Sequence, residues 1–206
     1  MNHILLVEGN NDKAVFGSIF KRYNLQKKFK IEVKDNVENL LKSIPVYVKT
    51  DVETIGIVVD ADFNIKSRWE SLKTKLKALE YDVPPDLNPN GTIISNEELP
   101  VIGIWIMPDN KSIGMLEDFV SYLVPVDDEL MPFVDETLIK LEDKGLNKYK
   151  DIHKSKAKIH TWLAWQETPG TPMGSAITKR YLDTDDEMCD KFVEWITNLF
   201  NLSPDK

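Results

Sequence analysis

The sequence is poor in the features that mark secreted and membrane proteins. It contains a single cysteine, Cys189, which excludes the disulfide framework of small secreted proteins. No apolar run approaches the roughly 20 residues that a membrane-spanning helix needs. The apolar run at Ile4–Val7 is too short for a signal peptide and has no basic flank. We therefore expect a cytoplasmic protein that does not bind membranes.

Several signatures of function are also missing. The 3 histidines are too scattered to form a zinc site with the lone cysteine, and no glycine-rich phosphate loop occurs. The net charge is −8, whereas proteins that bind nucleic acid by neutralising phosphates usually carry a basic face. A local basic surface that contacts nucleic acid is still compatible with the sequence. No feature predicts an oligomeric state. Lysine and arginine cluster at residues 21–22, 27–30, 154–158 and 179–180.

Strands and helices are predicted to alternate in the first half of the chain. Continuous apolar runs bounded by helices are typical of strands that a parallel sheet buries on both faces. Pro45 is expected to end the second helix, because proline lacks the N–H that a helix interior uses. Strands are predicted at residues 4–7, 29–33, 55–59, 92–94 (a short edge strand) and 101–107, and helices around 14–20, 37–48 and 66–79.

The second half is predicted to be mostly helical, with helices after Gly114 and near residues 127–143, 155–167, 174–181 and 185–200. No linker and no internal repeat separates the halves. We therefore expect one domain over residues 1–206. An open, mostly parallel α/β sheet flanked by helices would occupy residues 1–125, and a helical extension over 126–206 would pack on it.

Acidic residues follow three of the predicted strands. Glu8 closes the first strand, Asp60 and Asp62 close the third along the chain, and Asp109 follows the last. Ligands of open α/β sheets bind outside the carboxyl ends of the strands, so these residues would share one edge. Close carboxylates repel one another unless a cation such as Mg²⁺ or Mn²⁺ lies between them. Asp60 and Asp62 would point the same way if the strand continues through Asp62.

Three further acids have competing interpretations. Asp12 lies four residues after Glu8, in the first turn of the predicted helix. It would either ligate or orient a metal ion, or simply interact with the helix dipole. Asp109, beside Pro108, is typical of a turn. For Glu117 we favour an interaction with a helix N-terminus over a role at a second metal.

Two sequence strings resemble the motifs of Toprim domains. The string Leu5-Leu6-Val7-Glu8-Gly9-Asn10-Asn11-Asp12 resembles the first motif, a strand that ends in Glu-Gly before a helix. The string Ile57-Val58-Val59-Asp60-Ala61-Asp62 resembles the second, a hydrophobic strand that ends in Asp-x-Asp. Toprim domains perform metal-assisted chemistry on phosphodiesters. The resemblance implies that Glu8 is a general acid/base or metal ligand and that Asp60 and Asp62 hold Mg²⁺.

The spacing of Glu8 and Asp12 is similar to that in overcoming-lysogenization-defect (OLD) nucleases. That likeness implies an assisting lysine, for which we select Lys156 over Lys158. The whole chain resembles an uncharacterised bacterial family of standalone Toprim-like proteins, on the strings at residues 103–110, 114–118 and 159–166. It lacks an ATPase motif, a zinc ribbon and the strand-passage machinery of topoisomerases.

The first hypothesis for function is a Mg²⁺-dependent nuclease. Glu8 would move a proton, Asp60 and Asp62 would hold the metal, and Asp12 and Glu117 are candidates for a second site. The second is a non-catalytic Toprim-like module that binds metal or nucleotide and acts in regulation or phage defence, which the acidic net charge favours. The third is a structural module whose carboxylates only cap helices.

Overall fold

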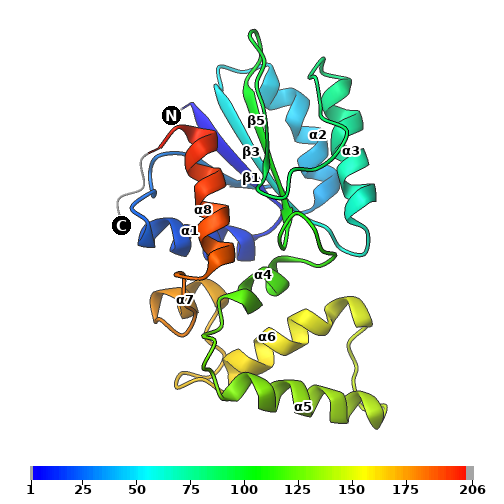
Figure 1. Ribbon diagram of the computed structural model, residues 1–206, viewed down its shortest axis with the longest axis vertical. Helices are drawn as coiled ribbons and strands as arrows, with labels where there is room; N and C mark the ends of the chain where they lie inside the picture. Colours follow the sequence, from blue (N-terminus) through cyan, green and yellow to red (C-terminus); the bar gives the residue numbers. More distant parts are fainter. Residues whose placement is uncertain (1, 203–206) are drawn as a thin grey trace.

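A single sheet of five strands, in the order β2-β1-β3-β5-β4, forms the centre of the molecule (Figure 1). The computed structural model describes residues 2–202. β2, β1, β3 and β5 are parallel, and β4 runs antiparallel to β5 at the edge. The predicted α/β class, mostly parallel sheet and short edge strand are thus confirmed. The strands are β1 (His3–Val7), β2 (Lys30–Val33), β3 (Thr54–Asp60), β4 (Thr92–Ile94) and β5 (Val101–Met107).

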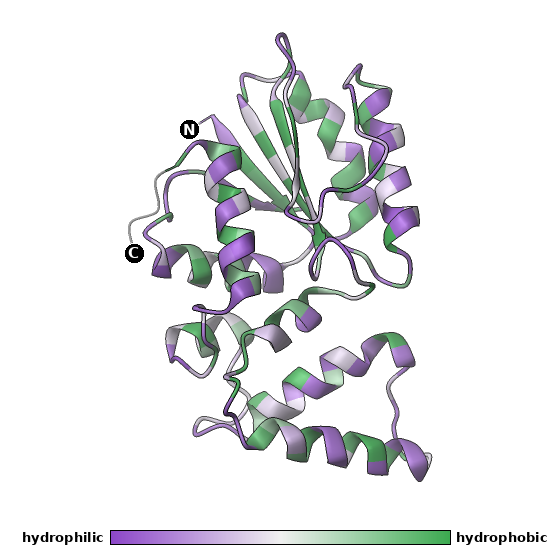
Figure 2. Cartoon of the chain, viewed as in Figure 1, coloured by the Kyte–Doolittle hydropathy of each residue, from purple (hydrophilic) through white to green (hydrophobic). Residues whose placement is uncertain are grey.

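Helices cover both faces of the sheet, and the alternation of side chains along β1 shows why. Leu5 packs in one hydrophobic cluster with helices α1 (Asn10–Arg22) and α8 (Glu187–Phe200). Its neighbour Leu6 packs in a second cluster with α2 (Val37–Val48) and α3 (Ile65–Lys77). Figure 2 shows the hydrophobic residues concentrated in the sheet and on the helix sides that face it. Burial on both faces explains the continuous apolar runs in the sequence.

The prediction that Pro45 ends the second helix is wrong. α2 continues through Pro45 to Val48. Proline there removes one backbone donor, so the single helical hydrogen bond to the carbonyl of Leu41 is lost. Leu40 and Ile44 are fully buried against the sheet, so tertiary packing holds the helical conformation across the proline.

The remaining helices do not form one layer. Helix α7 (Met173–Thr178) packs on α1, whereas α5 (Leu130–Asp143) and α6 (Lys154–Ala164) lie side by side and project away from the sheet (Figure 1). A short helix, α4 (Leu116–Tyr122), connects β5 to this pair and contacts α6. A 3₁₀ turn, η1 (Asp151–His153), precedes α6. Within the described part of the chain, no helix is long and apolar enough to cross a membrane.

Helix α8 lies close to the sheet because two paired strand positions carry no side chain. Gly56 of β3 and Gly103 of β5 are register partners. A Cβ atom added to Gly103 would lie 2.3 Å from Cδ2 of Leu199 on α8, and one added to Gly56 would lie 3.1 Å from the same atom. Because interiors are close-packed, a side chain at Gly103 would force Leu199 of α8 to move.

Replacing Gly103 by alanine is expected to destabilise the protein by about 1–3 kcal/mol, since the new methyl group overlaps Leu199. Gly17→Ala in α1 is the matched control, because a Cβ there meets nothing within 4 Å. The control should be neutral or gain up to about 1 kcal/mol from the better helix propensity of alanine. Urea denaturation followed by circular dichroism measures both changes. Equal stability of the two variants would contradict the close packing of α8.

Candidate functional site

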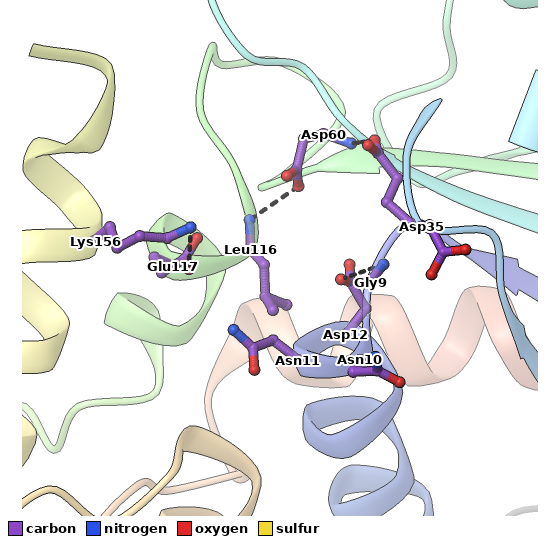
Figure 3. A pocket seen from close by; sticks show the side chains of 10 residues that line it. Gly9, Asn10, Asn11, Asp12, Asp35, Asp60, Leu116, Glu117 and Lys156 are labelled. Atoms are coloured by element: carbon purple, nitrogen blue, oxygen red, sulfur yellow. Dashed lines mark hydrogen bonds and ion pairs between the residues drawn. The ribbon is translucent and has the colours of Figure 1, made fainter. Parts of the chain in front are cut away.

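A pocket of about 340 Å³ opens at the carboxyl ends of β1 and β3 (Figure 3). The charged side chains that line it come from five separate segments of the chain. Five are acidic and one is basic: Glu8, Asp12, Asp35, Asp60, Glu117 and Lys156. The pocket therefore combines partial enclosure with an excess of negative charge, which favours binding of a cation.

Glu8 and Asp60 are held together by the sheet itself. β1 and β3 are neighbouring parallel strands, so the residue after β1 lies beside the last residue of β3. The Asp60 backbone N–H donates to Glu8 Oε1 at 2.8 Å. Burial raises the pKa of Glu8 above its ordinary value, although this hydrogen bond and the positive charge of Arg68 oppose the rise. Glu8 is thus a fixed carboxyl group that is easier to protonate than usual.

The Asp60 side chain connects the sheet to helix α4. Its Oδ1 accepts a hydrogen bond from the backbone N–H of Leu116, the first residue of α4, at 3.0 Å. Burial raises the pKa of Asp60 well above the ordinary value, and the negative charges of Asp12, Glu8 and Glu117 raise it further. The partial positive charge at the start of α4 favours the ionised form of Asp60, but it does not outweigh burial and repulsion.

Asp12 caps the start of α1 and also lines the pocket. It is the third residue of α1, and its Oδ2 accepts from the Gly9 backbone N–H at 3.0 Å, which caps the helix start. The side chain also lines the pocket and is buried. Burial raises the pKa of Asp12 to about 7, with repulsion from Glu8 and Glu117 contributing.

Glu117 forms an ion pair with Lys156, with Oε1 and Nζ 3.2 Å apart. Glu117 is buried, whereas the lysine side chain is half exposed. Glu117 lies in the first turn of α4, but the capping hydrogen bond there belongs to its neighbour: Asp118 Oδ2 accepts from the Met115 N–H at 2.8 Å. Glu117 instead contributes its carboxylate to the pocket.

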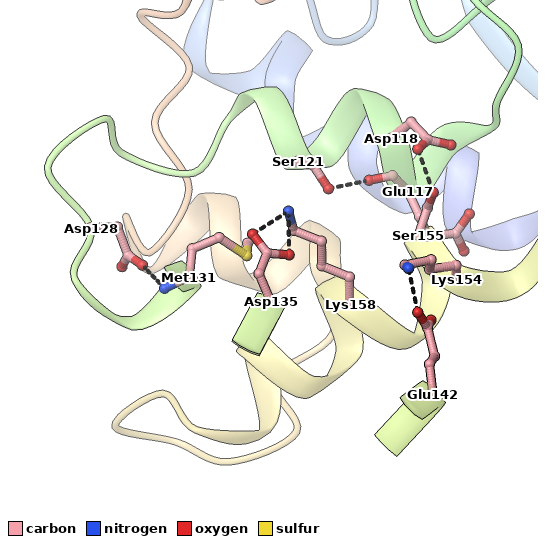
Figure 4. Close-up of polar contacts among 10 residues, drawn as sticks. All are labelled: Glu117, Asp118, Ser121, Asp128, Met131, Asp135, Glu142, Lys154, Ser155 and Lys158. Atoms are coloured by element: carbon pink, nitrogen blue, oxygen red, sulfur yellow. Dashed lines mark hydrogen bonds and ion pairs between the residues drawn. The ribbon is translucent and has the colours of Figure 1, made fainter. Parts of the chain in front are cut away.

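Polar contacts connect α6 to α4 and α5 (Figure 4), and Lys156 of α6 lines the pocket. The Ser155 hydroxyl donates to Asp118 of α4, which places the next residue beside Glu117. Lys158, the other lysine considered from the sequence, pairs with Asp135 of α5 at 2.8 Å and does not line the pocket. Of the two lysines, the structure therefore brings only Lys156 to the acidic residues.

Asp62 is not brought into the pocket. β3 ends at Asp60, and Asp62 adopts a φ of 51°, so the continued strand that would have aligned both carboxylates does not form. Arg68 of α3 contacts this turn twice: its Nη2 lies 2.6 Å from Asp62 Oδ2, and its Nε donates to the Asp60 carbonyl at 2.7 Å. Asp62 influences the pocket only through its charge, which helps to raise the pKa of Glu8.

Sequence reasoning missed two residues at this edge. Asp35 follows β2 and lines the pocket, so the strand-end rule that selected Glu8 and Asp60 would also have found it. Arg68 carried no such signal, because its two contacts depend on the turn after Asp60. Asp109 accepts from the backbone N–H groups of residues 111 and 112, at 3.0 and 2.7 Å, which confirms the predicted turn.

The donors in the pocket fit a hard divalent cation. All the anionic groups are carboxylates, and burial raises the pKa of three of them, as expected where the compensating charge is a bound ion. Within residues 2–202, no three His, Cys, Asp or Glu side chains are arranged to hold a metal ion by themselves. A cation here would bind one or two carboxylates and keep several waters, as Mg²⁺ commonly does beside substrate phosphates.

Comparison with known proteins identifies a family for this chain, but no activity is known for that family. Residues 2–201 match the model of a family described as "Protein of unknown function (DUF3226)". No curated protein and no solved structure gives a significant match. The resemblance to Toprim domains therefore stays a prediction that depends on the two motifs.

Proposed function

Since the chain belongs to DUF3226, a family of proteins of unknown function, we propose its function from the site: divalent-metal-dependent cleavage of phosphodiesters in nucleic acid, as a Toprim-like nuclease. One observation carries the proposal. Five carboxylates and a single lysine line one pocket at the carboxyl edge of a parallel sheet. This edge is where open α/β sheets bind their ligands.

Asp12 and Asp60 would hold the cation, because they line the pocket from adjoining segments and each has a raised pKa that a bound cation would reverse. When bound, Mg²⁺ or Mn²⁺ polarises phosphoryl oxygens and makes water more acidic. Asp62 would not contact the cation. Its ion pair with Arg68 holds it outside the pocket, and its negative charge would act on the cation from there. Glu117 is a candidate for a second cation, which would compete with Lys156 for its carboxylate.

The protein's own groups account for proton transfer and charge stabilisation. Glu8 is fixed by the Asp60 N–H, and its raised pKa brings the carboxyl group closer to the range where a general acid/base works best. Lys156 reaches the pocket from α6, and its half-exposed ammonium can turn from Glu117 toward a phosphate oxygen. The N-terminus of α1, at Asn10 and Asn11, offers backbone N–H groups to a phosphate.

A second candidate function is a non-catalytic module that binds metal or nucleotide and regulates a partner. The net charge of −8 favours it, because repulsion from the acidic surface weakens binding to long nucleic acids. In this case the cation would bind as above, but Glu8 would transfer no proton.

A two-stage experiment tests the proposal. The melting temperature is first measured in EDTA and in Mg²⁺ or Mn²⁺, because a ligand that binds only the folded protein stabilises it by about 2.7 kcal/mol at 100 times its Kd. Cleavage of single- and double-stranded DNA and RNA is then compared for the wild type and Glu8→Gln. We expect Glu8→Gln to lower the cleavage rate by about 10²- to 10⁴-fold.

Glu194→Gln on the exposed face of α8 is the matched control and should cleave at the wild-type rate. Stabilisation by metal without cleavage that depends on Glu8 would favour the regulatory module. No stabilisation at millimolar metal would refute the metal site, and the carboxylates would then be structural.

A further inference from the structure

One carboxylate joins the two helices that bring opposite charges to the pocket. Asp118 of α4 accepts a hydrogen bond from the Met115 backbone N–H through Oδ2, at 2.8 Å, and another from the Ser155 hydroxyl through Oδ1. The first bond closes the start of α4, which carries Glu117, and the second reaches the first turn of α6, which carries Lys156. These two hydrogen bonds are termed the Asp118 link. The link joins both segments that form the ion pair, although Asp118 does not line the pocket.

Lys156 lies on a different side of α6 from the neighbouring lysines. Lys154 pairs with Glu142 at 2.6 Å and Lys158 pairs with Asp135 at 2.8 Å, and both acids belong to α5 (Figure 4). Residues four apart share one face of a helix, whereas a residue two positions from each of them lies nearly opposite. The pairs with α5 therefore leave Lys156 on the side away from α5, where the Asp118 link joins α6 to α4.

The backbone before α4 leaves room for the Asp118 carboxylate. Gly114 has a φ of 140°, and a Cβ atom added there would lie 2.6 Å from Asp118 Oδ2. Two backbone hydrogen bonds with Asp62, at 2.8 and 2.9 Å, hold Gly114 in place. Any side chain at this position would push the carboxylate away from its two donors. The link therefore depends on the conformation of the chain between β5 and α4.

We propose that Asp118 and Ser155 are positioning residues for Lys156, which hold its ammonium group beside Glu117 before a substrate binds. The inference rests on the proposed function, because the same lysine would stabilise a phosphate oxygen at the pocket. A positive charge that is already in place needs no reorganisation when negative charge develops on the phosphate. The Asp118 link thus sets where the lysine of the pocket lies.

The Asp118 link also sets the charge that a metal ion meets. The side chain of Lys156 is 45% exposed and that of Glu117 is 4% exposed, so the lysine is the partner that is free to move. Beside Glu117, the ammonium offsets part of the negative charge that attracts a cation, whereas water screens the ammonium once it turns outward. Breaking the link should therefore strengthen metal binding while it removes the lysine from the phosphate.

A double-mutant cycle of Ser155→Ala and Lys156→Gln, with Mn²⁺ affinity measured by isothermal titration calorimetry, tests this effect. Ser155→Ala leaves the charge of the protein unchanged and should tighten Mn²⁺ binding about 2- to 5-fold, whereas Lys156→Gln should tighten it about 5- to 10-fold. In the Lys156→Gln background, Ser155→Ala should have no effect, because the group that it positions is absent. Ser155→Thr keeps the hydroxyl and should bind like the wild type. Lys158→Gln is the matched control for charge and should change the affinity by less than about 2-fold.

Acetylation of the lysines by acetic anhydride in EDTA, followed by peptide mass spectrometry, tests the positioning without metal. Ser155→Ala should speed the acetylation of Lys156 about 2- to 5-fold, because an ammonium held against a carboxylate is less available to the reagent than one in solvent. Lys154 and Lys158 should react as in the wild type, since their acidic partners belong to α5. A serine that only stabilised the start of α6 would affect all three lysines alike.

Several results would overturn the positioning role. Acetylation of Lys156 that is unchanged by Ser155→Ala contradicts it, and so does equal acceleration at Lys154, Lys156 and Lys158. An effect of Ser155→Ala on Mn²⁺ affinity that persists in the Lys156→Gln background also contradicts it, because the serine would then act on the pocket without the lysine. A wild type that binds no Mn²⁺ refutes the metal site, and the acetylation pattern then decides the positioning role by itself.

Discussion

Asp60→Asn is expected to abolish stabilisation by Mg²⁺ or Mn²⁺ while making the metal-free protein more stable. The amide keeps an oxygen that can accept the Leu116 N–H, so the contact between β3 and α4 survives. It removes a carboxylate whose raised pKa shows that ionisation is costly in the folded protein at neutral pH. At a metal concentration of 100 times Kd, the wild type should gain about 2.7 kcal/mol and the variant close to none. Melting curves in EDTA and in metal measure both effects.

Asp62→Asn is the control, because it removes a nearby carboxylate that lies outside the pocket. Asp62 pairs with Arg68 outside the pocket, so this variant should lose part of the turn after β3 but keep the response to metal. A metal response in Asp60→Asn equal to that of the wild type would contradict the site. If Asp60→Asn is less stable than the wild type in EDTA, the carboxylate stabilises the metal-free fold, contrary to this prediction.

The metal-free protein is expected to lose stability as the pH rises from about 4 to about 8. Asp12 has a pKa of about 7 in the folded chain, against an ordinary value of 3.8. A raised folded pKa gives stability that is complete below the unfolded pKa and is lost as the pH passes through the folded one. For Asp12 the change is on the order of 4 kcal/mol, at about 1.4 kcal/mol per pKa unit. Burial shifts the pKa of Glu8 and Asp60 in the same direction.

Urea denaturation in EDTA between pH 4.5 and 8.5 measures this slope. Asp12→Asn should flatten it, whereas Asp143→Asn at the exposed end of α5 should leave it unchanged. Mg²⁺ should oppose the slope, because ligands must lose their protons before they bind metal, and affinity therefore rises with pH. Stability that increases with pH in EDTA would contradict the raised pKa of Asp12.

The positions of Glu8 and Asp60 were predictable because they depend on topology alone. Both follow strands with continuous apolar runs, and neighbouring parallel strands end at the same edge. The direction of Asp62 was not predictable, since it depends on one backbone angle and on an arginine of the next helix. Lys156 was proposed only from a family resemblance. Its arrival beside Glu117 requires α4 and α6 to meet, which no local pattern encodes.

In the second half of the chain, too, local features were predictable from the sequence whereas their packing partners were not. The sequence predicted a helix near residues 185–200 but not the surface that buries it. Phe192 and Trp195 turned out to pack against Trp105 of β5. The glycines at 56 and 103 were visible in the sequence, but their function became apparent only when Leu199 was seen to lie above them.

The placement of α8 has a consequence for how the protein is made. A ribosome releases the four parallel strands long before it synthesises the residues that cover one side of them. Until residue 200 has emerged, α8 cannot pack on Trp105 and the two strand glycines. The nascent chain therefore exposes part of a hydrophobic sheet face. This face of the central sheet can therefore pack fully only after residues 187–200 have been synthesised.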